Sequence, residues 1–465
     1  MMEPKRSHSM ASGLGAKAAS SETSPKREGQ ERGVRTIEIG GVLVPESPAS
    51  LGDAGIDPEV LVNLTLKLAY ISPQFSTGST SRELHLPFAL AAELLERLRA
   101  EKMVEVLGDE GPLGYRFRIT QPGRERAVWL MAVSGYVGPA PVSLQAYSAM
   151  LALQLPRLPK ASAQAVTSAI SDLVLSEISV EIAGLAVSSG RSLFLYGPPG
   201  NGKTSLGKLI HRAFQGSFWI PHCIGVENHI IRIFDQQCHT EASADIPREA
   251  SEKSDQRWVR IRRPFVVVGG ELTLADLDLS YDTARGYYEA PLHLKANGGT
   301  FLLDDFGCQS TPPNQLLNRW IVPLENQLDY LTLRTGQQIQ VPFRNMLVIS
   351  TNLDPDKVMA PGLLRRMGYR LCVSDPSPQQ YALIFSRYAA GCGSEVPPGL
   401  LDWLLGRYQA EHRRLHGCEP RDLIDRARDI CNYRGRPVAL TPEIMNLAWT
   451  GYFLNKALET TPPQM

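Results

Sequence analysis

One eight-residue segment constrains the fold of this 465-residue chain more than any other part of the sequence. It is rich in glycine, ends in lysine and threonine, and reads Gly197-Pro198-Pro199-Gly200-Asn201-Gly202-Lys203-Thr204. An apolar, strand-like run at residues 192–196 precedes it, and a helix-like segment beginning at Ser205 follows it. A strand, a glycine-rich loop and a helix in this order are typical of the phosphate-binding P-loop. The sequence therefore predicts an α/β fold built on a parallel sheet.

The residue types of this loop suit the binding of phosphate groups. Glycines let backbone N–H groups turn inward without a Cβ clash, and the helix that follows presents its positive N-terminal end. We expect Lys203 to reach the β- and γ-phosphates of ATP and the Thr204 hydroxyl to coordinate Mg²⁺. The bare pattern arises by chance in about 1–2% of chains of this length. We therefore predict that ATP and Mg²⁺ bind at residues 197–205.

Two further apolar strands end in polar side chains that complete such a site. Residues 298–303 are followed by Asp304 and Asp305, and residues 344–351 are followed by Asn352. We expect Asp304 to hold Mg²⁺ through water and Asp305 to polarise the attacking water. An asparagine at a strand end also caps turns, so capping is the alternative interpretation of Asn352.

These motifs together resemble those of AAA+ ATPases. In that family an asparagine called sensor 1 lies between the acidic residues and the γ-phosphate, and the resemblance assigns this role to Asn352. Most members carry Glu where this chain has Asp305, although helicase-loader ATPases share the Asp-Asp ending. Because Asp is one methylene shorter than Glu, the attacking water would lie farther from the Asp305 carboxylate, which affects the rate of hydrolysis.

Two segments narrow the resemblance to the pre-sensor-1 hairpin clade. Residues 296–300 are similar to the corresponding segment of MoxR proteins, magnesium chelatases and sigma-54 activators. Residues 328–333 and 337–341 are predicted to form a β-hairpin that turns at residues 335–336. A hairpin inserted between the acidic strand and the Asn352 strand marks this clade.

Two arginine motifs extend the resemblance toward the C-terminus. Residues 361–367 resemble the arginine-finger segment, which assigns Arg365 or Arg366 as the finger, with a slight preference for Arg366. Arg421 resembles the sensor-2 arginine that contacts phosphate in its own subunit. A guanidinium stabilises the charge that builds on a transferred phosphoryl group. A finger that reaches a neighbour implies a homo-oligomeric, hexameric ring. A salt bridge within a charged helix is the alternative for each arginine.

The pattern of helices, strands and breaks divides the chain into five regions. The second region reads as three helices followed by a hairpin, an order that resembles the winged-helix fold. The last region reads as several helices with Gly and Pro breaks between them. The predicted regions are a disordered tail at 1–45, a winged-helix-like domain at 46–135, a linker at 136–164, an AAA+ core at 165–375 and a helical lid at 376–465.

A winged helix suggests DNA, but the charges of this one favour a protein partner. Residues 46–150 contain nine Lys/Arg and twelve Asp/Glu, a net charge of −3, whereas DNA-binding surfaces are normally basic. The expected recognition helix begins at residues 87–93, which include no Arg, Asn or Gln to read base edges. We therefore favour protein–protein contact over DNA contact.

The remaining features bear on location and on substrate contact. The chain has 48 Lys+Arg and 48 Asp+Glu, and its seven cysteines form no Cys-x-x-Cys pair, which favours a reducing cytoplasm. We find no apolar run of about 18 residues and no secretory signal, so no membrane span is expected. Tyr287 and Tyr288 are expected to be buried on a helix; a substrate-gripping loop in a ring is the alternative.

The sequence as a whole predicts an AAA+ ATPase with a helical lid and a winged-helix-like domain. It would hydrolyse Mg-ATP to remodel a macromolecular partner, most simply a protein whose identity the sequence leaves open. One alternative is an ATP-controlled DNA-binding regulator or loader. Another is a switch that binds ATP and barely hydrolyses it.

Overall fold

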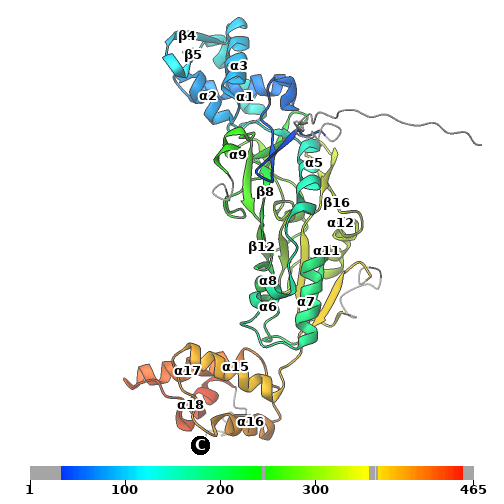
Figure 1. The fold of residues 1–465 in the computed structure, drawn as a ribbon, viewed down its shortest axis with the longest axis vertical. Helices are drawn as coiled ribbons and strands as arrows, with labels where there is room; N and C mark the ends of the chain where they lie inside the picture. The colour runs from blue at the N-terminus through cyan, green and yellow to red at the C-terminus, as the bar shows by residue number, and fades with distance from the viewer. Residues whose placement is uncertain (1–32, 243–246, 356–361, 363–364, 454–465) are drawn as a thin grey trace, which may run out of the picture.

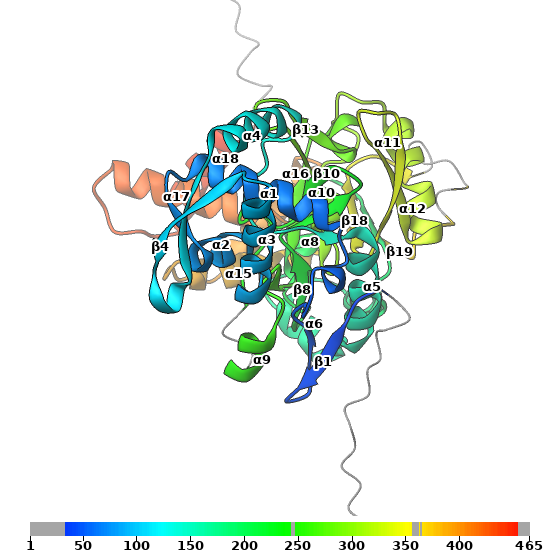
Figure 2. The same cartoon turned by 90° about the horizontal axis from the view of Figure 1, so that it is seen from above.

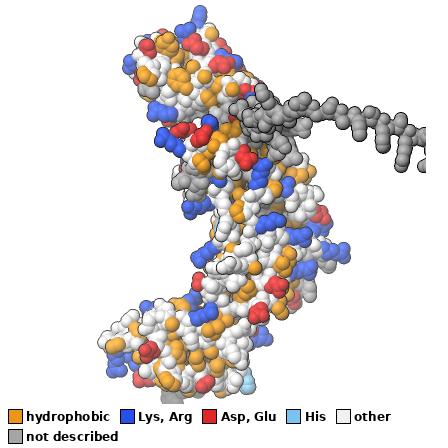
Figure 3. Space-filling model, viewed as in Figure 1, with side chains coloured by type: hydrophobic (Ala, Val, Ile, Leu, Met, Phe, Trp, Pro, Cys, Tyr) orange, Lys and Arg blue, Asp and Glu red, His pale blue; other side chains and the backbone are white. Residues whose placement is uncertain are grey.

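The computed structural model describes residues 33–242, 247–355, 362 and 365–453 of the chain. These residues form an elongated arc with an N-terminal domain at one end, sheets in the middle and a helical bundle at the other end (Figure 1). The two ends project to the same side, which leaves one concave flank in the space-filling view (Figure 3).

A five-stranded parallel sheet forms the centre of the middle part, in the order β12-β15-β18-β7-β19. The chain adds strands on both sides of β7, so the strand order reverses there, and ligands of open α/β sheets bind at the carboxyl end of such a reversal. The predicted parallel α/β fold is therefore confirmed. Its strands are β7 (Leu193–Tyr196), β12 (Phe265–Val268), β15 (Thr300–Leu303), β18 (Met346–Thr351) and β19 (Tyr369–Cys372).

Helices bury both faces of this sheet, which explains why its strands are continuous apolar runs rather than alternating ones. Phe301 and Leu303 of β15 pack with Trp320 in one apolar cluster, whereas Leu302 packs with Leu206 in the opposite one. Helices of the first cluster are α11 (Pro313–Arg319) and α12 (Ile321–Asn326), and those of the second are α6 (Ala163–Ala169), α7 (Glu177–Ser189) and α8 (Lys203–His211).

Residues 162–189 form two helices, α6 and α7. Ser162 caps α6, because its hydroxyl accepts the Ala165 N–H at 3.1 Å. Ser176 then caps α7 by accepting the Ser179 N–H at 3.2 Å. A second capping serine starts a new helix, so residues 171–175 between the two helices are left as an irregular segment.

A mixed sheet extends the molecule toward the N-terminal domain. Its strand order is β13-β14-β10-β9-β6, and β8 pairs with β11 beside it. Tyr287 and Tyr288 lie on β14 and are 9% and 2% exposed, so their burial is confirmed but the predicted helix is wrong. The bounds are β6 (Val142–Ser143), β8 (Ser217–Pro221), β9 (Cys223–Val226), β10 (His229–Arg232), α9 (Arg248–Lys253), β11 (Trp258–Arg262), η6 (Ala275–Leu277), β13 (Ser280–Asp282), β14 (Tyr287–Glu289) and α10 (Leu292–Lys295).

The linker expected at residues 136–164 is wrong, because this segment is part of the packed core. It contains β6, α5 (Leu144–Gln154) and η4 (Leu155–Arg157). Tyr147 and Met150 of α5 are fully buried, and Gln154 exchanges two hydrogen bonds with the backbone of Trp219 at 2.6 and 2.8 Å. Prolines at positions 139, 141, 156 and 159 lie on either side of this apolar helix.

The tail expected at residues 1–45 is wrong in its last part. Residues 1–32 lie outside the described residues, but β1 (Thr36–Ile39) and β2 (Val42–Pro45) form an antiparallel hairpin. Gly40 and Gly41 make its two-residue turn with φ of 59° and 77°, a conformation that glycine adopts without strain. Val44 is fully buried and attaches the hairpin to the core.

The N-terminal domain contains the predicted three helices followed by a hairpin, with a fourth helix packed on the first. Leucines of the first and third helices form one apolar cluster with the strands of the hairpin. The elements are η2 (Gly52–Ala54), α1 (Pro58–Ile71), β3 (Phe75–Ser76), α2 (Thr77–Leu84), α3 (Phe88–Ala100), β4 (Val104–Asp109), η3 (Gly111–Leu113), β5 (Tyr115–Ile119) and α4 (Gln121–Val133).

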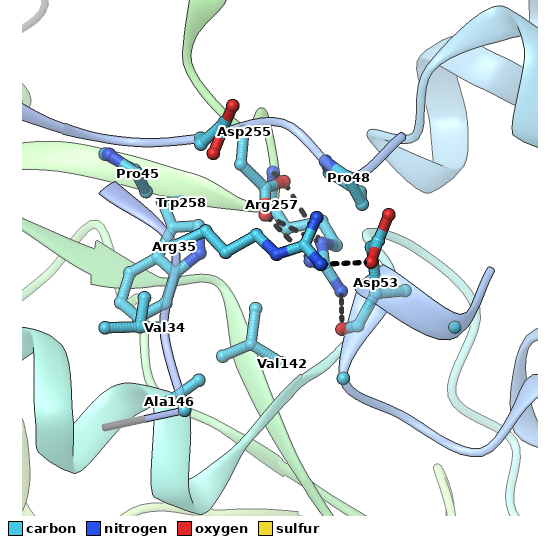
Figure 4. A pocket seen from close by; sticks show the side chains of 15 residues that line it. Val34, Arg35, Pro45, Pro48, Asp53, Val142, Ala146, Asp255, Arg257 and Trp258 are labelled. Atoms are coloured by element: carbon cyan, nitrogen blue, oxygen red, sulfur yellow. Dashed lines mark hydrogen bonds and ion pairs between the residues drawn. The ribbon is translucent and has the colours of Figure 1, made fainter. Parts of the chain in front are cut away.

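A buried ion pair joins this domain to the core (Figure 4). Arg257 and Asp255 are 5% and 3% exposed and pair at 2.8 Å. Arg257 also donates to the carbonyl oxygens of Ala54 at 2.8 Å and Pro141 at 3.2 Å, so its buried charge is fully paired. The pair lines a cavity of about 270 Å³ beside the β1–β2 hairpin.

The C-terminal helices form a separate bundle, which we call the lid. Seen from above, α17 of the lid and α12 of the core extend to opposite sides of the long axis (Figure 2). The lid helices are α15 (Pro378–Gly391), α16 (Leu400–Ala410), α17 (Glu419–Tyr433) and α18 (Pro442–Tyr452). The predicted hairpin is also present, as β16 (Leu328–Thr332) and β17 (Gln338–Pro342). Across the described residues, no helix combines the length and apolar character that a membrane crossing requires.

Candidate functional site

A cavity of about 450 Å³ lies between the P-loop, the segment that joins α6 to α7, and the lid. Its position at the carboxyl end of β7 is the one that the strand order predicts for a ligand. Most predicted site residues line it, together with lid residues that the sequence did not single out. The lining residues are Asp172, Leu173, Val174, Leu175, Pro199, Gly200, Asn201, Gly202, Lys203, Thr204, Ser205, Asp305, Asn352, Ile384, Tyr388, Gly417, Cys418 and Arg421.

The first helical turn of α8 contacts the end of β15 directly. The hydroxyl of Thr204 donates a hydrogen bond of 2.9 Å to the Asp304 carboxylate, although the two residues are 100 positions apart. Both are oxygen-bearing groups of the kind that Mg²⁺ prefers. The structure therefore brings together the two residues that the sequence suggested for the metal.

A second bond ties the other ends of the same two elements. The ring nitrogen Nδ1 of His211, at the end of α8, lies 2.9 Å from the hydroxyl of Thr300 at the start of β15. Between the two ties, a Cβ at Gly207 would lie 3.0 Å from a methyl group of Leu302, so helix and strand are in close contact. The position of Thr204 over Asp304 is thus fixed by the whole length of α8.

Lys203 is held inside the loop by backbone oxygens. It is 5% exposed, and its ammonium donates to the carbonyls of Gly197 at 2.9 Å and Pro198 at 2.7 Å. Burial lowers the pKa of Lys203, while the nearby carboxylates of Asp305 and Asp304 act in the opposite direction. A buried cation with only neutral acceptors gains most from an anion placed beside it.

Two glycines of the loop lie so close to neighbouring residues that a side chain at either position would clash. Gly197 has φ of 132°, and a Cβ there would lie 2.4 Å from the carbonyl oxygen of Val373. At Gly200, with φ of 79°, a Cβ would lie 2.7 Å from the sulfur of Cys418 in the lid. The loop backbone therefore packs closely against the residue that follows β19 and against the lid, which glycine allows because it has no Cβ.

Gln309 fixes the acidic end of β15 and was not found from the sequence. Its amide nitrogen donates to the carbonyl of Gly269 at 3.1 Å and lies 3.4 Å from the carbonyls of Asp304 and Asp305. Asp305 has φ of 46°, which is uncommon for a residue other than glycine and costs about 1–3 kcal/mol. The surrounding bonds maintain this conformation, which directs Asp305 into the cavity wall.

Asn201 of the P-loop links the loop to the lid. Its amide nitrogen donates to the carboxylate of Asp375 at 2.8 Å, and its amide oxygen accepts the Gly417 N–H at 2.9 Å. Asp375 also lies 3.2 Å from the imidazole of His416. One P-loop side chain therefore contacts both the segment that leads into the lid and the loop that precedes α17.

Arg421 and Tyr388 form the lid side of the cavity. The Arg421 guanidinium lies 3.0 Å from the Asp422 carboxylate, and its side chain is 59% exposed. The Tyr388 hydroxyl donates to Asp425 at 2.9 Å. Arg421 lines the cavity, and a phosphate bound there would compete with Asp422 for its guanidinium.

Arg365 and Arg366 do not line the cavity. Arg366 pairs with Glu325 and donates to the carbonyl of Gly362 at 2.7 Å, whereas Arg365 is exposed. Residues 356–361 and 363–364 lie outside the described residues, so only part of the predicted finger segment is seen.

Comparisons with known proteins find one family model that matches the lid, and solved structures that resemble part of the chain. The family model described as "Domain of unknown function (DUF8689)" matches residues 377–451, the range that holds α15 to α18. No curated protein sequence matches the chain.

Solved structures resemble the chain over about three fifths of its length. NtrX from Brucella abortus in complex with ADP is 15% identical with a TM-score of 0.37, covering 60% of this chain and 56% of that one. The same protein in complex with ATP is 15% identical with a TM-score of 0.37, covering 64% and 60%. The Thermotoga maritima RuvB Holliday junction branch migration motor is 13% identical with a TM-score of 0.35, covering 59% and 68%. The chain thus spans less than two thirds of the NtrX chain.

Proposed function

We propose that this chain is an AAA+ ATPase that binds and hydrolyses Mg-ATP in the cavity between the P-loop and the lid. The hydrogen bond between Thr204 and Asp304 carries the proposal, because it joins the two motifs that would share one metal ion. The parallel sheet, the buried Lys203 and the cavity lined by Asp305 and Asn352 support it.

Each residue of the site would have a separate role in phosphoryl transfer. Lys203 would exchange its two carbonyl partners for phosphate oxygens, and Thr204 with Asp304 would hold Mg²⁺, which neutralises charge on those oxygens. Asp305 would accept a proton from the attacking water, and Asn352 would orient that water by hydrogen bonding. Residues 172–175 would pack beside the nucleoside.

A ring assembly would complete the site with an arginine from a neighbour. Arg366 is already paired with Glu325 within its own subunit, whereas Arg365 is exposed. We therefore assign Arg365 as the finger and Arg366 as the residue that positions its segment. Arg421 would contact phosphate in its own subunit by leaving Asp422, which couples the lid to the nucleotide.

Exposed apolar side chains on the N-terminal domain support a protein partner that the ATPase remodels. Phe88, at the start of α3, is 44% exposed, and Tyr115, at the start of β5, is 52% exposed. Val106 and Leu107 of β4 are 37% and 39% exposed. In a winged-helix-like domain these elements form the contact surface, and apolar groups suit a protein better than a phosphate backbone.

The test is a pair of lysine variants on the same helix. Lys203→Ala removes the ammonium in the loop, whereas Lys208→Ala removes an exposed lysine of α8. We expect Lys203→Ala to weaken Mg-ATP binding by about a hundredfold and to abolish turnover, because charge-assisted bonds to phosphate are lost. Lys208→Ala should match the wild type. Wild-type turnover no higher than that of Lys203→Ala would rule out the hydrolase.

A trapping variant tests the order of events and captures the partner. Asp305→Asn keeps the size of the side chain but removes the base, so ATP should bind normally while turnover falls by about 10²–10⁴. The trapped protein should then retain its protein partner in a pull-down with ATP and release it with ADP. A variant that still turns over ATP at the wild-type rate would exclude Asp305 as the base.

A further inference from the structure

A second large cavity lies at the opposite end of α8 from the P-loop. Its volume is about 660 Å³, within the range of ligand pockets. Three elements form it: the end of α8 with His211 and Arg212, the loop that contains His239, and Arg262 and Arg263 at the end of β11 and after it. We call it the basic pocket.

The charged side chains that line the basic pocket are all positive. Arg212, Arg262 and Arg263 line it, and no Asp or Glu is among its lining residues. Within the described part of the chain, none of these three arginines forms an ion pair closer than 4.0 Å. Most other arginines that approach a cavity in this protein, such as Arg257, face a carboxylate. Positive groups are therefore concentrated here without neutralisation.

The two histidines of the basic pocket contribute no charge at neutral pH. Burial lowers the pKa of His211 to about 4 and also lowers that of His239. The His239 ring accepts the Asp235 N–H at 3.0 Å through Nδ1, so its Nε2 carries the proton and donates to the Lys295 carbonyl at 2.8 Å. The positive charge of the pocket is consequently that of the arginines alone.

Two contacts hold the side chain of Arg263 in place. Its Nε donates to the carbonyl of Gly298 at 2.8 Å, and its guanidinium lies over the ring of Phe214 at 4.5 Å. Burial lowers the pKa of Arg263 to about 10, so it remains charged at neutral pH. These contacts fix the plane of the guanidinium and leave its terminal nitrogens for another acceptor.

Ordinary structural roles explain part of this arrangement. Arg212 closes α8, where a cation is favourable whether or not a ligand is present. The aromatic faces of Phe214 and Phe265 are already covered by Arg263 and His211, so they are not platforms for bases. What remains unexplained is the presence of both Arg262 and a partly buried Arg263 in one cavity whose lining residues include no carboxylate.

We propose that the basic pocket binds a phosphate group through Arg262 and Arg263, with Arg212 completing the positive surface. Paired guanidiniums match the oxygens of phosphate, and a desolvated arginine without an acidic partner is stabilised by one. The phosphate has two possible sources, a free phosphate or pyrophosphate ion and the phosphodiester backbone of a single strand. This inference is independent of the nucleotide site, because it uses none of its residues.

Calorimetry with two probes tests the proposal in the Lys203→Ala background, which removes the main phosphate-binding lysine of the P-loop. The probes are pyrophosphate and an oligothymidylate of about ten nucleotides, each titrated into the full chain. We expect Arg262→Gln/Arg263→Gln to weaken binding of at least one probe by about tenfold or more. Arg262→Gln alone, at an exposed position that does not threaten folding, should weaken it about threefold.

The control is Arg116→Gln, an exposed arginine of the N-terminal domain, which should leave both affinities unchanged. Binding of pyrophosphate alone assigns the pocket to a free ion, and binding of the oligonucleotide in competition with pyrophosphate assigns it to a nucleic acid strand. Equal binding by the background protein and its double-arginine variant would overturn the proposal. Binding of polyglutamate in place of both probes would overturn it as well.

Discussion

At the residue scale, the groups that would meet the nucleotide are already held by the protein. Lys203 is bonded to two carbonyls, Thr204 to Asp304, and Asn201 to Asp375. Each of these bonds satisfies a polar group that would otherwise be costly to bury. Because these side chains are already ordered, ligand binding would lose little of their conformational entropy.

Gln309 provides a residue-scale prediction about turnover. Gln309→Leu removes the amide that accepts from Gly307 and lies near the carbonyls of Asp304 and Asp305. We expect single-turnover hydrolysis to slow by about tenfold, while the Kd for ATP changes less than about twofold, because positioning affects the reacting geometry more than binding. Gln315→Leu on the exposed side of α11 is the control. Equal loss of binding and turnover would show a general loss of structure instead.

Lys67 provides a prediction about pH. It is 5% exposed, donates to the Ser134 carbonyl at 2.9 Å, and burial lowers its pKa to about 8. Below pH 8 the lysine is charged in both states, and the folded state carries the cost of burying it. Between pH 8 and about 10 the unfolded state binds more protons, so stability rises with pH.

Lys67→Met should remove this dependence. We expect the variant to be more stable by about 1–3 kcal/mol at pH 7 and to lose the rise in stability between pH 8 and 10. Urea unfolding of both proteins at pH 7, 8 and 9.5 measures the effect. A wild-type stability that falls steadily from pH 8 to 9.5 while the variant behaves identically would contradict it.

The sequence predicted the residues that carry phosphate chemistry but not those that position them. Lys203, Thr204 and Asp304 follow from short motifs whose chemistry is local. Gln309 and the contact of Asn201 with Gly417 depend on segments far apart in the chain, and an isolated Gln or Asn has no distinguishing pattern. Only the folded backbone shows which carbonyl or N–H lies opposite them.

At the scale of elements, α8 and β15 form the unit that carries the site. Gly207 lets them approach, since a Cβ there would lie 3.0 Å from Leu302. Gly207→Leu should lower the free energy of unfolding of the core by about 1–3 kcal/mol, because overpacking displaces one element from the other. The matched control is Gly406→Leu in α16, where a Cβ would meet nothing within 4 Å. Urea unfolding followed by amide exchange in β15 compares them; equal losses would refute the close approach.

Elements with strong local patterns were predicted well, and those bounded by misleading residues were not. The hairpin β16–β17 and the lid helices follow from alternation and helical spacing. Residues 136–164 were predicted to be a linker, although the apolar residues of α5 pack against β8. The strand β14 was expected as a helix because a three-residue strand is too short to show a period.

At the scale of the whole molecule, Arg257 is one of the residues that join the N-terminal domain to the core, through its hydrogen bond to the Ala54 carbonyl. Arg257→Met leaves the buried Asp255 without its partner, and we expect a loss of about 3–5 kcal/mol in the stability of this junction. Thermal unfolding and protease cleavage between the two parts measure the loss. Asp255→Leu/Arg257→Met removes both charges and should recover much of it. A double variant as unstable as the single one would argue against an effect of the unpaired carboxylate.

The arrangement of the parts was the level least accessible to sequence. The order of an N-terminal domain, a core and a lid was predicted, but the contacts that join them were not. The β1–β2 hairpin and α5 were assigned to a tail and a linker because each is short and flanked by Gly or Pro. Both are stabilised by tertiary burial, as Val44 and Met150 show, and burial of this kind is not visible in a local pattern.

The double tie between α8 and β15 has a mechanical consequence. The nine-residue helix α8 and the four-residue strand β15 are hydrogen-bonded to each other at both ends, so we expect them to move as one rigid unit. At 1.5 Å per residue α8 is about 14 Å long, so this unit extends from the carboxyl end of β15 to its amino end. A small displacement of Thr204 would therefore also displace His211, because α8 is a continuous helix between the two residues. The position of Thr204 and the position of His211 would therefore be coupled within a single subunit.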